Sequence, residues 1–259
     1  MWRVSRLALL GLMTIGLLGL TGCSEDDAVA PVATNQVDPE TAEQFATQAL
    51  EMINGMAAEI PYVAQGDFTQ GSFAKAGEQP TWDPAQMAWV YDATANFTEG
   101  DPPTTEGETR VSVWIQFRNG EGPLSTVLGA TEMEYRASSG MTVAMAEAGS
   151  VAHMEFDLST TMVVTFVAED SYAVQGTGQA DVAASQSAEG RTESMAFRMV
   201  WGMDLAVPAA GCPAGTAFVD VAPYRMDAAY NGQGQVDWTL TGPNYRATGT
   251  DPVACGQPL

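Results

Sequence analysis

Residues 193–205 read ESMAFRMVWGMDL, and they carry the clearest pattern in the chain. Every second residue is apolar and most are large, whereas the residues between them are mostly small, polar or charged. This alternation is typical of a β-strand that turns one face to a core and the other to water. The apolar side chains on the shared face are Met195, Phe197, Met199, Trp201, Met203 and Leu205. The stretch therefore predicts a strand of a sheet with one buried face.

The same two-residue period recurs between residues 86 and 241. Turn signals separate the runs, among them Asn-Gly pairs at 119–120 and 231–232. We expect about ten strands joined mostly by short turns, and short connections make neighbouring strands antiparallel. Residues 140–149 fit either a strand or one short helix.

One helix is predicted before the strands. Asp38 suits the N-cap and Pro39 the first helical position. Apolar residues then recur at helical spacing, and Pro61 is expected to end the helix. The stripe consists of Phe45, Ala49, Met52, Ile53, Met56 and Ile60.

These elements predict a mainly β protein. Residues 39–259 are expected to form a single domain, in which one curved antiparallel sheet, closed or half closed into a barrel, holds the helix on its concave side. A two-sheet sandwich is the alternative.

The N-terminus carries an export signal. Arg3 and Arg6 precede an apolar run at residues 7–20, which is shorter than the roughly 20 residues that span a bilayer as a helix. The run ends in Leu20-Thr21-Gly22-Cys23, which resembles the lipobox of bacterial lipoproteins. The resemblance implies that residues 1–22 are a signal peptide and that Cys23 carries diacylglycerol and further acyl chains such as palmitate.

The residues after Cys23 extend this interpretation. Ser24 at the next position resembles cargo sent to the outer membrane, so we expect a lipid-anchored protein facing the periplasm or the cell surface. Residues 23–38 are then the lipidated cysteine and a flexible tether, because the segment is polar and has no period.

The charge balance excludes one class of partner. Without residues 1–22 the chain keeps 8 of its 10 basic residues and all 32 acidic ones, a net charge of −24 (8 − 32). Such a charge repels nucleic acid and anionic lipid surfaces. The acidic residues are scattered, which favours solubility or a saline habitat as their explanation; attraction of divalent cations or basic partners is the alternative.

Cys212 and Cys255 remain once Cys23 is assigned to lipid. Two cysteines in an exported chain most simply form a disulfide, here closing a loop of about 44 residues and stabilising by about 4 kcal/mol in the chain-entropy model. A catalytic thiol is the alternative, and His153, the single histidine, would have to be its base.

The row from Met195 to Leu205 suggests a binding function. Flexible thioether side chains adapt to varied apolar guests, so the row predicts the lining of an apolar pocket. An ordinary core filled with methionine is the alternative. A copper site is disfavoured because methionine and histidine do not cluster with ligand spacing.

Catalytic signals are weak. His153 is expected on the polar face of its strand beside Glu155, and no hydrolase, phosphate-loop, metal or dinucleotide motif is present. Gly176 and Gly178 indicate a bend or glycines beneath a bulky neighbour, and Trp114 on a polar face is a weak sugar-stacking candidate. We therefore expect an envelope lipoprotein without cofactor or metal that binds an apolar small molecule or a protein partner. The alternatives are a purely structural lipoprotein and a hydrolase-type enzyme.

Overall fold

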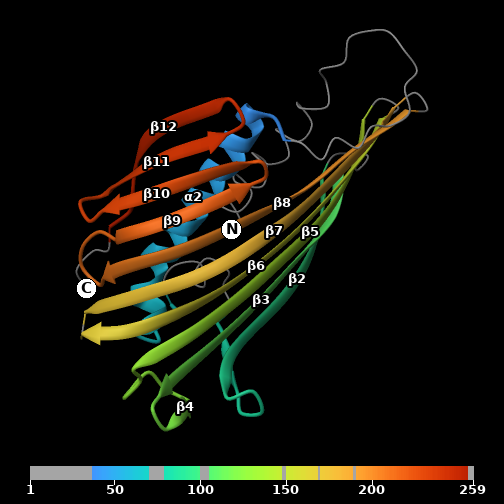
Figure 1. Cartoon of the computed structure of the whole chain (residues 1–259). Helices are drawn as coiled ribbons and strands as arrows, with labels where there is room; N and C mark the ends of the chain where they lie inside the picture. The colour runs from blue at the N-terminus through green and yellow to red at the C-terminus, as the bar shows by residue number, and fades with distance from the viewer. Residues whose placement is uncertain are drawn as a thin grey trace.

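The computed structural model describes residues 37–69, 79–99, 105–147, 150–168, 170–188 and 191–255. Cys23, the predicted signal peptide and the tether up to residue 36 lie outside the described residues. Twelve strands form one antiparallel sheet that curves around the helix α2 (Pro39–Ala64) (Figure 1). Among the described residues, no helix is both long enough and apolar enough to cross a membrane.

The strands follow one another in the sheet in chain order, except that β4 pairs only with β3. Their bounds are β1 Thr81–Asp83, β2 Ala88–Glu99, β3 Thr105–Asn119, β4 Gly122–Leu124, β5 Glu132–Glu147, β6 Ser150–Ala168, β7 Ser171–Ala188, β8 Arg191–Pro208, β9 Ala214–Val221, β10 Tyr224–Asn231, β11 Gln235–Gly242 and β12 Tyr245–Pro252. The sheet is not closed, and β1 and β12 are its edges. The fold is thus the predicted single curved sheet with one helix, and not the two-sheet alternative.

The strand count differs from the predicted ten for identifiable reasons. β1 and β4 have three residues each, too few to show a period, and β12 has small or polar residues at most of its inward positions. The apolar alternation of residues 152–158 and that of residues 162–166, which the sequence pattern separates into two strands, belong to one strand, β6. Thr160 points inward and interrupts the apolar pattern, but it is buried and its hydroxyl donates to the Thr177 carbonyl at 3.2 Å. Residues 140–147 belong to β5, which settles the open choice in favour of a strand.

Helix α2 begins as predicted. The Asp38 carboxylate accepts hydrogen bonds from the Thr41 amide at 3.0 Å and the Thr41 hydroxyl at 2.6 Å. The prediction that Pro61 ends the helix is wrong, because the helix continues to Ala64. Pro61 removes only one backbone donor, and the burial of Pro61, Val63 and Ala64 offsets that loss.

The helix packs mainly against β8, β9 and β10. Phe45, Ile53 and Ile60 of the predicted stripe are at most 2 % exposed, and they form one continuous core with the inner face of the sheet. Two tyrosine hydroxyls add polar contacts, from Tyr230 to Asn54 and from Tyr245 to Glu43.

Two glycines of β7 lie beneath large side chains, which confirms that interpretation of the pair. A Cβ atom on Gly178 would lie 2.2 Å from Cζ2 of Trp201, and one on Gly176 would lie 2.8 Å from Cγ of Met162. The absence of side chains at these positions makes room for the core residues of neighbouring strands.

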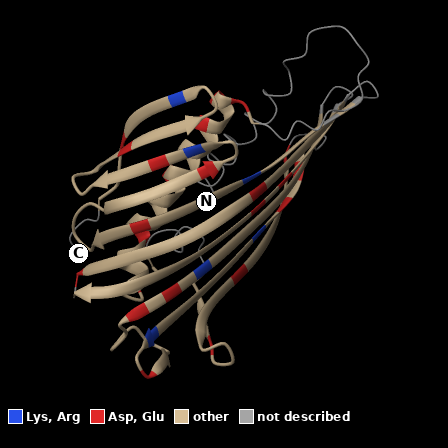
Figure 2. Ribbon diagram, viewed as in Figure 1, with Lys and Arg blue, Asp and Glu red and all other residues tan. Residues whose placement is uncertain are grey.

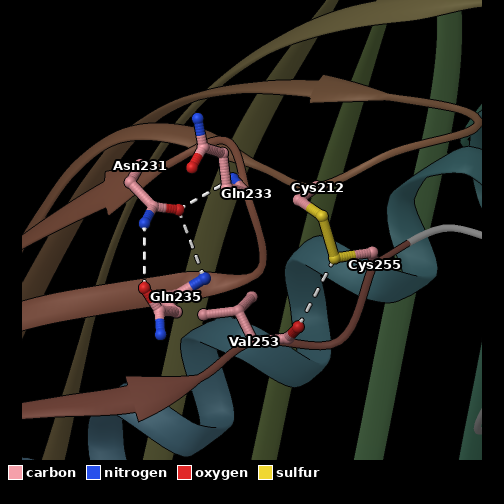
Figure 3. The surroundings of a disulfide bond; sticks show 6 residues. All are labelled: Cys212, Asn231, Gln233, Gln235, Val253 and Cys255. Carbon is pink, nitrogen blue, oxygen red and sulfur yellow. Dashed lines mark hydrogen bonds between the residues drawn. A yellow bond between two sulfur atoms is a disulfide. The ribbon is translucent and has the colours of Figure 1, made fainter.

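The predicted disulfide joins Cys212 to Cys255 with an S–S distance of 2.04 Å (Figure 3). It ties the segment that follows β12 to the segment that precedes β9. The turn between β10 and β11 lies beside it, where the Asn231 side chain accepts a hydrogen bond from the Gln233 amide at 2.7 Å. Charged residues lie at intervals along the strands and do not form a block (Figure 2).

Candidate functional site

The methionine-rich stretch forms β8, between β7 and β9. Met199, Trp201, Met203 and Leu205 are at most 6 % exposed and belong to the packed core. These four side chains therefore fill the interior. Of the six residues predicted to line a pocket, only the first two, Met195 and Phe197, remain candidates, because they are half-buried.

Met195 and Phe197 each belong to a row of inward side chains that crosses six strands. Register pairing places both rows on β2, β3 and β5–β8. We call these two rows the distal inner face; its members are Phe97, Gly107, Val143, Met154, Ala184 and Met195 in the first row, and Ala95, Thr109, Met141, Phe156, Val182 and Phe197 in the second. Thr109 is the single polar member, and its hydroxyl donates to the Ala95 carbonyl.

The distal inner face begins beyond the point where the N-terminal turns of α2 contact the sheet. The Phe45 ring, two turns into α2, lies 4.5 Å from the Phe197 ring between centroids. The six strands continue past this point toward one side of the molecule (Figure 1). Beyond the contact Phe97, Met154 and Met195 are half-buried, whereas the rows beneath the helix are closed. The two distal rows also have buried members, each at most 8 % exposed: Thr109, Met141, Val143 and Val182. Along the strands the inner surface thus changes from a filled core to an apolar surface that is only partly covered.

His153 lies on the opposite, outer face of β6. It is exposed, and within the described chain its side chain makes no hydrogen bond or ion pair. A shallow groove of about 850 Å³ passes it and crosses the same six strands. Most of the residues that line the groove, including Glu106 and Glu155, occupy positions whose side chains lie on the outer face of the sheet. No group of three His, Cys, Asp or Glu side chains is placed to hold a metal in the described residues.

Trp114 also lies on the outer face, as predicted. The Arg136 guanidinium lies over its ring at 4.6 Å from the centroid. The Glu134 carboxylate holds Arg136 there and binds Arg118 as well. Because a cation already covers this ring, Trp114 is a poor platform for stacking a sugar.

Two inner-face tyrosines have perturbed titration. Burial raises the pKa of Tyr135 well above its ordinary value, and the negative charge of Glu59 raises it further. Burial alone raises the pKa of Tyr230. Both phenols therefore resist ionisation, and the Tyr230 hydroxyl donates to the Asn54 side chain.

Comparisons of the chain with models of protein families, with curated proteins and with solved structures find no match.

Proposed function

We propose that the protein is a non-enzymatic, lipid-anchored component of the bacterial cell envelope that holds an apolar guest against the distal inner face. One observation carries the proposal: beyond the contact of Phe45 with Phe197, the inner face stays apolar across six strands, and part of it, at Phe97, Met154 and Met195, is left half-accessible. Inner faces of this kind bury apolar surface against a core or a ligand.

The composition of the surface suits a guest of variable shape. Met154 and Met195 carry flexible, polarisable side chains, and Ala184 lies between them in the row. At about 4.8 Å between strands, the row spans roughly 24 Å from β2 to β8. A guest lying across the strands meets methionine, alanine and phenylalanine side chains, and it needs no polar partner.

The lipid anchor supplies the location in this proposal. The resemblance of residues 20–23 to a lipobox supports it, and the net charge of −24 favours a domain held off an anionic lipid surface. Residues 24–36, which precede the buried Val37, reach at most about 45 Å when fully extended. Cys23→Ala is expected to release the protein from the membrane fraction without changing its unfolding midpoint. Persistence in that fraction contradicts the anchor.

The guest is tested with an uncharged apolar dye, N-phenyl-1-naphthylamine, because an anionic dye is repelled by the acidic chain. Met154→Glu places a carboxylate on the distal inner face and is expected to weaken dye binding at least about tenfold, since burying an unpaired charge costs several kcal/mol. The matched control is Val151→Glu, on the same strand but the outer face, where Val151 is 41 % exposed. It is expected to leave binding unchanged.

The purely structural alternative is favoured by the burial of Met199 to Leu205 and is separated by the same experiment. Absence of dye binding by the parent chain, together with absence of any co-purifying apolar molecule in native mass spectrometry, rejects the guest. Equal weakening by both glutamate variants rejects the distal inner face as its location.

A further inference from the structure

Strand β12 is an open edge of the sheet, and three of its residues direct their backbone N–H and C=O groups away from β11, the neighbouring strand. The Val253 amide donates to the Gly234 carbonyl at 2.9 Å and continues the register of β11 with β12. Odd-numbered residues of β12 therefore turn their backbone groups toward β11, and Arg246, Thr248 and Thr250 turn theirs away. In the described part of the chain, no other strand pairs with this edge.

The side chains on this edge include an unsatisfied cation. Six arginine side chains are described, and five of them have a carboxylate within 4.0 Å. Arg246 alone has no carboxylate partner among the described residues. It is exposed on the outer face at the start of β12. In a chain with 32 acidic residues, an arginine without a partner needs an explanation.

We infer that β12 pairs with β12 of a second copy of this chain about a two-fold axis, with Thr248 opposite Thr248 of the copy. Residues that face each other in an antiparallel pair must have their side chains on the same face of the sheet. Both residues of a hydrogen-bonded pair must also direct their backbone groups away from β11, toward the partner strand. Centring on Thr248 satisfies both conditions and pairs Arg246 with the partner's Thr250. A register centred on Gly249 or Thr250 brings in Pro252, which has no amide proton, and one centred on Ala247 sets Thr250 opposite Asn244 of the turn before β12. The Thr248 register alone pairs the three residues among themselves.

The charges on the outer face agree with this register. Within one chain Thr250 lies beside Asp237 of β11 and donates to its carboxylate at 2.6 Å. Arg246 of one copy would thus face the partner's Thr250, with the partner's Asp237 one strand further on. Two strand spacings are about 10 Å between Cα atoms, which an extended arginine and an aspartate bridge together. The two-fold axis makes this ion pair twice.

The pairing is independent of the proposed guest, because β12 contributes nothing to the distal inner face. Electrostatic repulsion between two strongly acidic domains disfavours the dimer, and salt screens this repulsion. Anchoring two copies to one membrane would raise their effective concentration and favour the same contact.

Sedimentation velocity of the purified full chain in density-matched detergent and physiological salt tests the inference. The parent chain is expected to show a concentration-dependent dimer. Thr248→Pro deletes the central outward donor and no bond to β11, so it is expected to weaken the dimer at least about tenfold while the far-ultraviolet circular dichroism stays unchanged.

A charge exchange tests the register itself. Arg246→Asp and Asp237→Arg are each expected to weaken the dimer, and the double variant is expected to restore it. Arg198→Asp makes the same charge change on central strand β8 and is expected to have little effect. A parent chain that stays monomeric overturns the inference, as does a dimer that tolerates Thr248→Pro. A double variant no stronger than the single ones overturns the Thr248 register.

Discussion

The contact between Gly178 and Trp201 allows one sharp prediction about stability. Trp201 is fully buried, and its ring lies directly over Gly178 of the neighbouring strand. A Cβ atom on Gly178 would lie 2.2 Å and 2.4 Å from two ring atoms and 2.7 Å from the Ser159 carbonyl oxygen. Ordinary contacts of this kind are about 3.5–4.0 Å, so Gly178→Ala requires the ring or the β6 backbone to move by more than an ångström.

The size of the effect follows from this overlap. Overpacking a well-filled core typically costs about 1–3 kcal/mol, and here neither neighbour is a flexible chain end. We expect Gly178→Ala to lower the free energy of unfolding by about 3 kcal/mol. The same substitution at Gly55, which is exposed in the middle of α2 with no atom near its Cβ position, is expected to raise it by about 0.5–1 kcal/mol.

Urea denaturation with the disulfide intact, followed by circular dichroism, measures both values. The slope with denaturant must stay constant for the comparison to hold. A third variant identifies the cause. Trp201→Phe has a smaller ring, and it also loses an indole N–H that has no partner among the described residues. In this background Gly178→Ala is expected to cost clearly less than in the parent chain.

Two results would refute the reasoning. If Gly178→Ala lies within about 0.5 kcal/mol of the parent chain, the ring does not occupy the space above Gly178. If its cost is the same in the parent chain and in the Trp201→Phe background, the cost comes from the backbone and not from the ring.

Two further predictions concern the ends of the fold. Burial raises the pKa of Asp38, but the hydrogen bonds from Thr41 outweigh it and hold that pKa below its usual value. The carboxylate therefore stabilises the helix above the ordinary aspartate pKa, and this contribution is lost as pH falls through the lower, folded-state pKa. Asp38→Ala is expected to cost about 1 kcal/mol at neutral pH and less in acid, measured by urea unfolding across pH. Replacing Cys212 and Cys255 by serine is expected to cost about 2–5 kcal/mol in the same assay, and an unchanged midpoint would show that the bridge constrains nothing.

Much of the architecture could be predicted from local patterns. The two-residue period marked most strands because one face of the sheet is buried and the other meets water. The start of α2 was evident at Asp38 and Pro39, and the pairing of Cys212 with Cys255 followed from counting cysteines. The end of the helix was not evident, because the cost of Pro61 is offset by packing that no local pattern shows.

Local patterns predicted less of the candidate site than of the fold. Side chains alternate along any strand, so the local pattern already places Met195 to Leu205 on one face. Their burial depends on the fold, in which the helix covers Met199 to Leu205 and leaves Met195 and Phe197 half-buried. The fold also decides which side chains of β2, β3 and β5–β7 join those two. It leaves β12 as an open edge of the described sheet, with an arginine that has no carboxylate partner there. The physical reason is that burial and pairing depend on the position of one element against another, which alternation within a strand does not encode.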